Sequence, residues 1–164
     1  MDTVIRSIAT YFIVIPIGGI GYVAITQKRQ ARLELLFVLV VGGGLSLLLA
    51  LVGSHFYHNP RPFVVGHFTP LIAHGTDNGF PSDHTLLSAF LAFVAFSYSR
   101  KLGASLLFVA VLIGSARMAA GVHHLSDVVG SICFAGLSCL AAVWLKNRLF
   151  KKSAATRESL KPAL

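Results

Sequence analysis

Long apolar stretches separated by short polar or basic segments dominate the chain. A helix needs about 20 apolar residues to cross roughly 30 Å of hydrocarbon. Five stretches are candidate spans: about Val4–Thr26, Leu33–Gly53, a stretch from near Pro81–His84 to just before Arg100, Leu102–Arg117, and about Leu125–Leu145. The pattern therefore predicts an all-α, polytopic transmembrane helix bundle of about five spans.

The third and fourth stretches are shorter than the other three. We expect either that these two helices extend through the polar motifs at their ends, or that those ends lie below the membrane surface. Both possibilities place the polar motifs at a sheltered site. A long polar loop, Ser54–Phe80, connects the second and third stretches.

The composition also indicates a membrane protein. Hydrophobic residues make up 55% of the 164 residues, charged residues make up 12%, and the mean hydropathy is +0.74, whereas a soluble domain carries about 25% charged residues. These values exclude a soluble enzyme, a disordered chain, a disulfide scaffold and a coiled coil. Cys133 and Cys139 lie in an apolar stretch and are typical of small core residues. We expect one domain over residues 1–150 and a polar, disordered cytoplasmic tail over residues 151–164.

The charged residues divide between the two ends of the predicted spans. In a membrane protein, a net charge of +8 indicates basic residues on the cytoplasmic side rather than nucleic-acid binding. Most of the basic residues fall on one face: Lys28, Arg29, Arg32, Arg100, Lys101, Lys146, Arg148, Lys151, Lys152, Arg157 and Lys161. The opposite face carries Arg6, Arg61, Arg117 and every histidine: His55, His58, His67, His74, His84, His123 and His124. We therefore expect the chemistry on the outward face.

Two arginines on the outward face are candidates for binding phosphate. Arg61 lies in the segment Asn59–Phe63, and Arg117 ends the fourth stretch. Guanidinium groups bind phosphate oxygens through two parallel hydrogen bonds, which lysine cannot do. Either arginine alone could be an interfacial anchor, but both stand at the end of a predicted span, where an ionisable group indicates function.

The segment Pro81-Ser82-Asp83-His84 has the pattern of a helix start, with a proline, a capping residue and then an apolar run. The free N–H groups of a first helical turn bind anions, and Ser82 can add its hydroxyl. We interpret Asp83 as an ordinary cap. His84 would lie beside a bound phosphate, where the near-neutral pKa of a histidine suits a general acid.

His123 and Asp127 are four residues apart, so they share one face if the last helix begins early. A carboxylate that accepts from one imidazole nitrogen leaves the other nitrogen free as a nucleophile. An isolated pair of this kind is more often a structural hydrogen bond. Arg117, six residues before His123, favours the catalytic interpretation.

Together these segments resemble the three-part signature of the type 2 phosphatidic acid phosphatase (PAP2) superfamily, which includes membrane lipid phosphatases and vanadium haloperoxidases. The family pattern reads KxxxxxxRP, PSGH and SRxxxxxHxxxD. The matching residues are Arg61-Pro62, Pro81-Ser82-Asp83-His84, and Arg117 with His123 and Asp127. The segments FPSDHT, PRPFV and Pro70–His74 more narrowly resemble bacterial undecaprenyl-diphosphate phosphatases of the bacitracin-resistance type.

The resemblance implies roles for individual residues. His123 would attack the terminal phosphorus and become phosphohistidine, while Asp127 would orient it and His84 would protonate the leaving oxygen. The phosphoryl oxygens would be held by Arg61, Arg117 and Ser82. Water would then hydrolyse the intermediate. No metal or other cofactor is implied, because arginines and helix-end N–H groups supply the positive charge.

Two positions depart from the family pattern. Ser54 stands where the pattern has lysine, and Ala116 precedes Arg117 where the pattern has serine. The missing lysine removes one phosphate-binding cation. We hypothesise that a histidine of the polar loop supplies part of the binding of the distal phosphate, the candidates being His55, His58 and His74.

The expected function is that of a lipid pyrophosphate phosphatase in a bacterial inner membrane, which converts undecaprenyl diphosphate to undecaprenyl phosphate and inorganic phosphate. Its site would face the extracytoplasmic side and its C-terminus the cytoplasm. Its partners would be the membrane and a lipid-linked pyrophosphate, with no nucleic acid.

Two alternatives remain open. A phosphatase or phosphotransferase for phosphatidylglycerol phosphate, phosphatidic acid or lipid A would need the same residues. A histidine-rich membrane protein that binds haem or a metal is the alternative from another class. The histidines disfavour it, because they lie in loops and at helix ends rather than facing each other inside spans.

Overall fold

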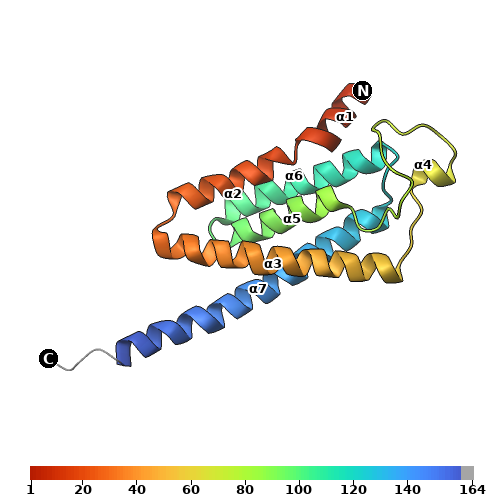
Figure 1. Ribbon diagram of the computed structural model, residues 1–164. Helices are drawn as coiled ribbons and strands as arrows, with labels where there is room; N and C mark the ends of the chain where they lie inside the picture. The colour runs from red at the N-terminus through yellow and green to blue at the C-terminus, as the bar shows by residue number, and fades with distance from the viewer. Residues whose placement is uncertain (160–164) are drawn as a thin grey trace.

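The computed structural model describes the backbone of residues 1–159 and the side chains of residues 1–150. The described residues form a bundle of helices without a named strand (Figure 1). The helices are α1 (Asp2–Tyr11), α2 (Val14–Thr26), α3 (Arg29–Phe56), α4 (Pro62–Val65), α5 (Asp83–Phe96), α6 (Arg100–Ala119) and α7 (Leu125–Ser159). The predicted all-α transmembrane bundle is confirmed.

Four segments are long and apolar enough to cross a membrane: Asp2–Thr26, Arg29–Phe56, Arg100–Ala119 and Leu125–Phe150. α5 is the shorter apolar helix, and its 14 residues span only about 21 Å. The third and fourth apolar stretches, the two short ones, therefore form helices of different length. α6 extends through its motif and includes Arg117. α5 begins only at Asp83 and is too short to cross the full thickness of the hydrocarbon layer.

α5 is the central helix of the bundle and packs against α2, α3, α6 and α7. Its buried face is rich in small side chains, namely Thr85, Ser88, Ala89, Ala92 and Ala95. Small residues let helices approach closely in a membrane. The same holds on α3, where a Cβ at Gly42 would lie 2.8 Å from Phe90 Cε2.

The first span is broken between α1 and α2. Pro16 causes the break, because it has no N–H to donate to Phe12 and its ring displaces the preceding turn. The Ile15 amide instead bonds to the Phe12 carbonyl at 3.0 Å, as in a tighter turn. α1 consequently leaves the axis of α2 and runs toward the end of the bundle where residues 57–82 lie (Figure 1).

The histidines and the basic residues of the helix links are at opposite ends of the bundle. α3 ends, α5 begins, α6 ends and α7 begins at the end that carries the loop and α4 (Figure 1). The links α2–α3 and α5–α6 are at the other end; Lys28 lies in the first of these links, and Arg100 begins the helix that follows the second. The topology therefore gathers the three motif segments at one end.

α7 continues to Ser159, past the boundary at Phe150 that the sequence placed between the domain and its polar tail. The side chains of residues 151–159 and the whole of residues 160–164 lie outside the described part of the structure. The disordered tail over residues 151–164 stays a prediction.

Candidate active site

Arg61 is buried at the start of α4, with 4% of its surface exposed. Its Nη1 donates to the Val122 carbonyl at 3.0 Å, and its Nη2 donates to the Asn78 carbonyl at 3.2 Å. Its Nε donates to Asp77 Oδ1 at 3.1 Å. Nη1 also lies 3.4 Å from His123 Nε2. The guanidinium is thus fixed by the polar loop and directed at an imidazole nitrogen.

His123 is 3% exposed and is held through its Nδ1 atom. Nδ1 lies 2.9 Å from the Gly79 carbonyl oxygen and 3.4 Å from Asp127 Oδ2. Because a carbonyl oxygen only accepts, Nδ1 carries the proton and Nε2 carries the lone pair. Nε2 is therefore available as a nucleophile, and in this structure it faces the Arg61 guanidinium.

Asp127 is fully buried at the start of α7. Its Oδ1 accepts from Asn59 Nδ2 at 2.6 Å, and its Oδ2 accepts from the His124 amide at 2.7 Å. These two bonds fix the carboxylate beside the His123 ring. The sequence predicted the pairing of His123 with Asp127, but it missed Asn59 as a residue of the site.

Ser82 is the N-cap residue of α5 and is completely buried. Its hydroxyl accepts from Thr85 Oγ1 at 3.1 Å, and its carbonyl accepts from Ser131 Oγ at 2.9 Å. The second bond joins the start of α5 to α7, because Ser131 belongs to α7. The positive end of α5 is thereby held next to the start of α7.

Arg117 is 3% exposed near the end of α6. Its Nη1 donates to the Ala9 carbonyl at 3.2 Å, and its Nη2 donates to His74 Nε2 at 3.0 Å. His74 Nδ1 must then carry a proton. Among the described residues, neither Arg117 Nε nor His74 Nδ1 has a hydrogen-bond partner, although both atoms are buried. Unpaired buried donors of this kind indicate a place for an anion.

The two arginines are connected through two imidazole rings. The His74 and His123 rings are 5.9 Å apart and nearly perpendicular, so contacts run from Arg61 through His123 and His74 to Arg117. His84 joins His74 and Arg117 in the lining of a cavity of about 500 Å³. The structure thus brings together His74, His84, Arg61, Arg117, His123, Asp127 and Ser82, all of which the sequence proposed.

The other candidate histidines lie outside this group. His55 and His58 are exposed, and in the described part of the chain no hydrogen bond links them to Arg61 or Arg117. His74 is the one of the three that contacts a site arginine. Asp83, interpreted as a cap, is exposed and makes no side-chain cap bond in the described structure.

The loop between α4 and α5 contacts Arg117 through His74, and Arg61 through Asp77 and Asn78. The hydrogen bond from Arg61 lowers the pKa of the Asp77 carboxyl below its usual value. Burial, and then the charges of Arg61 and Arg117, lower the pKa of His74. Neutral His74 can accept the hydrogen bond from Arg117, and protonated His74 cannot.

This environment predicts an acid-dependent loss of stability. Because the pKa of His74 is lower in the folded chain, the unfolded chain binds its proton more readily, and the stabilisation present above about pH 6.5 is lost as the pH falls through the folded pKa. We expect His74→Gln, which can accept from Arg117 at any pH, to lose less thermal stability than the wild type between pH 7.5 and pH 5. Thermal unfolding in detergent measures this difference. Equal losses in the two proteins would contradict it.

No group of three or more His, Cys, Asp or Glu side chains is placed to hold a metal ion within residues 1–150. The charged and titratable side chains that the structure brings together are two guanidiniums, three imidazoles and two carboxylates, those of Asp127 and Asp77. Such a set can bind a tetrahedral anion, attack it and transfer a proton.

Comparisons with known proteins agree with this geometry. A family model described as the PAP2 superfamily matches residues 31–151. The bacitracin transport permease protein BcrC of Bacillus licheniformis is 29% identical over 150 residues, which cover 91% of this chain and 73% of that protein. The undecaprenyl-diphosphatase BcrC of Bacillus subtilis (strain 168) is 34% identical over 110 residues, which cover 67% of this chain and 55% of that protein.

A solved structure has the same fold. The crystal structure of a transmembrane PAP2 type phosphatidylglycerolphosphate phosphatase from Bacillus subtilis matches with a TM-score of 0.60 and 24% identity, covering 90% of this chain and 77% of that one. The family match begins two residues inside α3, ends at residue 151 within α7, and includes all three motif segments. The chain therefore belongs to the PAP2 superfamily.

Proposed function

We propose that this chain is a membrane phosphatase that hydrolyses a lipid diphosphate, undecaprenyl diphosphate, to the lipid monophosphate and inorganic phosphate. The observation that carries the proposal is the approach of Arg61 Nη1 to His123 Nε2 at 3.4 Å. This approach supports the proposal because an oxyanion-binding group lies beside an unprotonated nitrogen that could act as a nucleophile once a phosphate oxygen takes over the contact with Arg61.

The first step transfers the terminal phosphoryl group to His123. The Nε2 lone pair forms a bond to phosphorus while the bond from phosphorus to the bridging oxygen breaks. His84, at the start of α5, gives its proton to that oxygen. The imidazolium charge that develops on His123 is stabilised by Asp127, and the Gly79 carbonyl keeps the Nδ1 proton in place.

The second step releases inorganic phosphate. Neutral His84 accepts a proton from a water molecule, whose oxygen attacks phosphorus while the bond between phosphorus and Nε2 breaks. In both steps Arg61 and Arg117 donate to the equatorial oxygens, where negative charge accumulates. Binding requires Arg61 Nη1 to exchange its contact with Nε2 for a phosphate oxygen, and Arg117 Nε to gain the partner it lacks.

The choice of lipid rests on the relatives. The Bacillus subtilis protein that is 34% identical is named an undecaprenyl-diphosphatase. The FPSDHT and PRPFV segments, which resemble those of undecaprenyl-diphosphate phosphatases, support the same substrate. The basic residues at the end opposite the site, among them Lys28, Arg29 and Arg100, support an extracytoplasmic site and a cytoplasmic C-terminus in a bacterial inner membrane. Phosphatidylglycerol phosphate is the second candidate substrate, because the same catalytic groups serve a lipid monophosphate.

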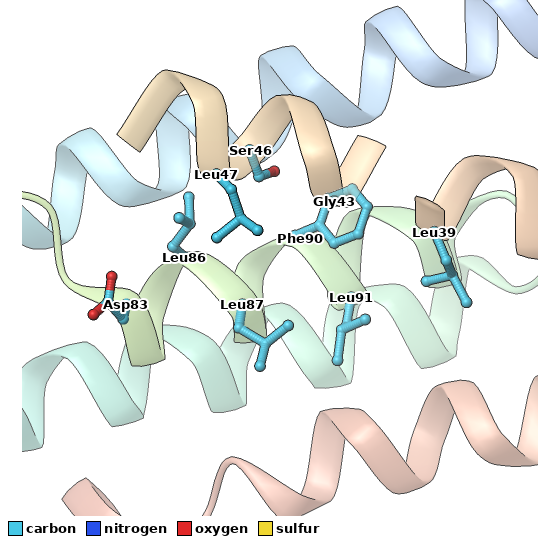
Figure 2. Close-up of a pocket in the computed structure, with 9 residues that line it drawn as sticks. All are labelled: Leu39, Gly43, Ser46, Leu47, Asp83, Leu86, Leu87, Phe90 and Leu91. Atoms are coloured by element: carbon cyan, nitrogen blue, oxygen red, sulfur yellow. The ribbon is translucent and has the colours of Figure 1, made fainter. Parts of the chain in front are cut away.

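An apolar groove offers a place for the hydrocarbon chain of the substrate. It lies between α3 and α5, has a volume of about 400 Å³, and is lined mainly by leucines with Gly43 and Phe90 (Figure 2). Asp83 lies at the end where α5 begins, next to His84 in the chain. The groove therefore leads from within the bundle to the first turn of α5, where the site is.

Filling this groove should weaken the binding of long lipids. In Gly43→Leu, the new side chain would replace several methylenes of the bound lipid, and we expect kcat/KM for undecaprenyl diphosphate to fall about 10-fold. Hydrolysis of the five-carbon isopentenyl diphosphate should change less than about 2-fold. Gly44→Leu is the matched control, because nothing lies within 4 Å of a Cβ at Gly44. Equal losses on both substrates would contradict this role for the groove.

The function itself is tested by phosphate release from a panel of purified lipids. The full chain in detergent would be given undecaprenyl diphosphate, phosphatidylglycerol phosphate and phosphatidic acid, each with and without EDTA, and His123→Ala would serve as the blank. We expect the fastest release from undecaprenyl diphosphate and no effect of EDTA. Absence of release from every lipid would refute the phosphatase assignment, and faster release from phosphatidylglycerol phosphate would refute the choice of lipid.

A further inference from the structure

The cavity beside His84 has a second wall that the reaction described above does not use. This wall belongs to α1, and its side chains are Thr3, Arg6, Ser7, Thr10 and Tyr11. The opposite wall carries His74, His84 and Arg117. α1 is held against the site because the Ala9 carbonyl accepts a hydrogen bond from Arg117 Nη1.

The cavity is built to hold negative charge. Its lining contains Arg6 and Arg117 and no carboxylate. Arg117 Nε and His74 Nδ1, two buried N–H donors, have no hydrogen-bond partner among the described residues, although Asp77 Oδ1 lies 4.0 Å from His74 Nδ1. Among residues 1–150, no carboxylate lies within ion-pair distance of Arg6. A cation and two unpaired donors around one cavity match the oxygens of a phosphate group.

A second cavity, on the other side of the site, is lined by carboxylates and does not favour an anion. This cavity of about 300 Å³ lies beside Arg61, and its lining includes Asp77 and Asp83. Two carboxylates repel a phosphate dianion. Ser54, which stands where the family pattern has its lysine, lines this same cavity. The cation missing at Ser54 is therefore not replaced there, and the free arginine is on α1.

We propose that Arg6, with the hydroxyl groups of α1 beside it, binds the phosphate that remains on the lipid, and that it makes the enzyme prefer a diphosphate to a monophosphate. This inference rests on the proposed phosphatase function. When His123 attacks the terminal phosphorus, the bridging oxygen must lie next to His84. The second phosphate then extends into the cavity that His84 shares with Arg6. A lipid monophosphate has no group to place there.

The experiment compares two substrates with the same hydrocarbon chain, farnesyl diphosphate and farnesyl monophosphate. It uses the full-length chain as wild type, Arg6→Ala, Arg6→Lys and the charge control Lys28→Ala, which changes an exposed residue at the other end of the bundle. We expect Arg6→Ala to lower kcat/KM for the diphosphate about 10- to 100-fold, the effect of one charge-assisted hydrogen bond. The monophosphate value should change less than about 3-fold. Arg6→Lys should recover part of the loss, and Lys28→Ala should match the wild type.

A binding measurement separates this inference from the proposed function. Titration with methylene diphosphonate and methylphosphonate measures binding without turnover. Arg6→Ala should weaken the binding of the diphosphonate about 10- to 100-fold and leave the binding of methylphosphonate unchanged. An equal loss for both ligands or both substrates, or no loss for either, would overturn the role of Arg6 while leaving the phosphatase intact. A wild type that releases phosphate from neither lipid would refute the proposed function, and the inference with it.

Discussion

Replacement of His123 by alanine should abolish phosphate release, lowering kcat by at least about 10⁴-fold. His123 provides the nucleophile of the first step, and its Nε2 is left unprotonated because Nδ1 donates its proton to the Gly79 carbonyl oxygen, with 2.9 Å between the nitrogen and the oxygen. Without the imidazole, the phosphoryl group has no acceptor in the site. Steady-state phosphate release from the preferred lipid measures the loss.

The control for this variant is another histidine at the same end of the bundle. His67 is exposed and has a φ of 51°, a conformation that asparagine tolerates better than most residues. His67→Asn should therefore fold and should retain wild-type turnover. If His123→Ala has the thermal unfolding temperature of the wild type but still releases phosphate at a tenth of the wild-type rate, another group is the nucleophile.

Asp127→Asn should lower kcat about 10²- to 10³-fold. In a serine-protease triad, the equivalent change costs about 10⁴-fold because the imidazole adopts the wrong tautomer. Here the Gly79 carbonyl also accepts from His123 Nδ1, so the tautomer is retained and only the stabilisation of the imidazolium is lost. The asparagine amide would also meet the Asn59 and His124 donors, which should reduce the free energy of unfolding by about 1–3 kcal/mol.

Ser126→Ala is the matched control for the aspartate variant. Ser126 is exposed, and its hydroxyl lies 3.4 Å from Asp127 Oδ1, the longest of the contacts to that carboxylate oxygen. We expect less than about a 2-fold change in kcat. A loss in Asp127→Asn as small as that in Ser126→Ala would show that Gly79 alone orients the nucleophile.

The sequence predicted those site residues that have a charged or titratable side chain. Arg61, Arg117 and His123 stand at the ends of apolar stretches, where a charged or titratable group has a high desolvation cost and so indicates function. The spacing of His123 and Asp127 predicted their proximity, which the structure gives as 3.4 Å. The apolar stretches predicted the bundle because each must bury its backbone groups within a helix.

The sequence could not predict contacts that depend on the tertiary arrangement of the loop. The acceptor closest to His123 Nδ1 is a backbone carbonyl, that of Gly79, and every residue has a carbonyl. Asn59 stands two residues before Arg61, yet its bond to Asp127 joins positions 68 residues apart. Pro16 lies within the first apolar stretch, and a proline there could have predicted the break between α1 and α2. That break brings α1 to the site.

Ser54 stands where the family pattern has a lysine, and the proposed role of Arg6 would account for the missing positive charge. The cavity that Ser54 lines contains Asp77 and Asp83. The cavity on the other side of the site is lined by Arg6 of α1 and Arg117 of α6. His55, His58 and His74 of the polar loop are the candidates that the sequence suggested for the missing cation, and Arg6 of the first predicted span is the candidate that the cavity lining adds.

The most direct measurement of the central claim is an experimental structure of the chain with bound orthovanadate, which adopts the trigonal bipyramidal geometry of a phosphoryl group in transfer. We predict that vanadium is bonded to His123 Nε2, that both Arg61 and Arg117 donate to its equatorial oxygens, and that His84 lies on the opposite apical side. Vanadate bound away from His123, or within reach of only one of the two guanidiniums, would contradict the account.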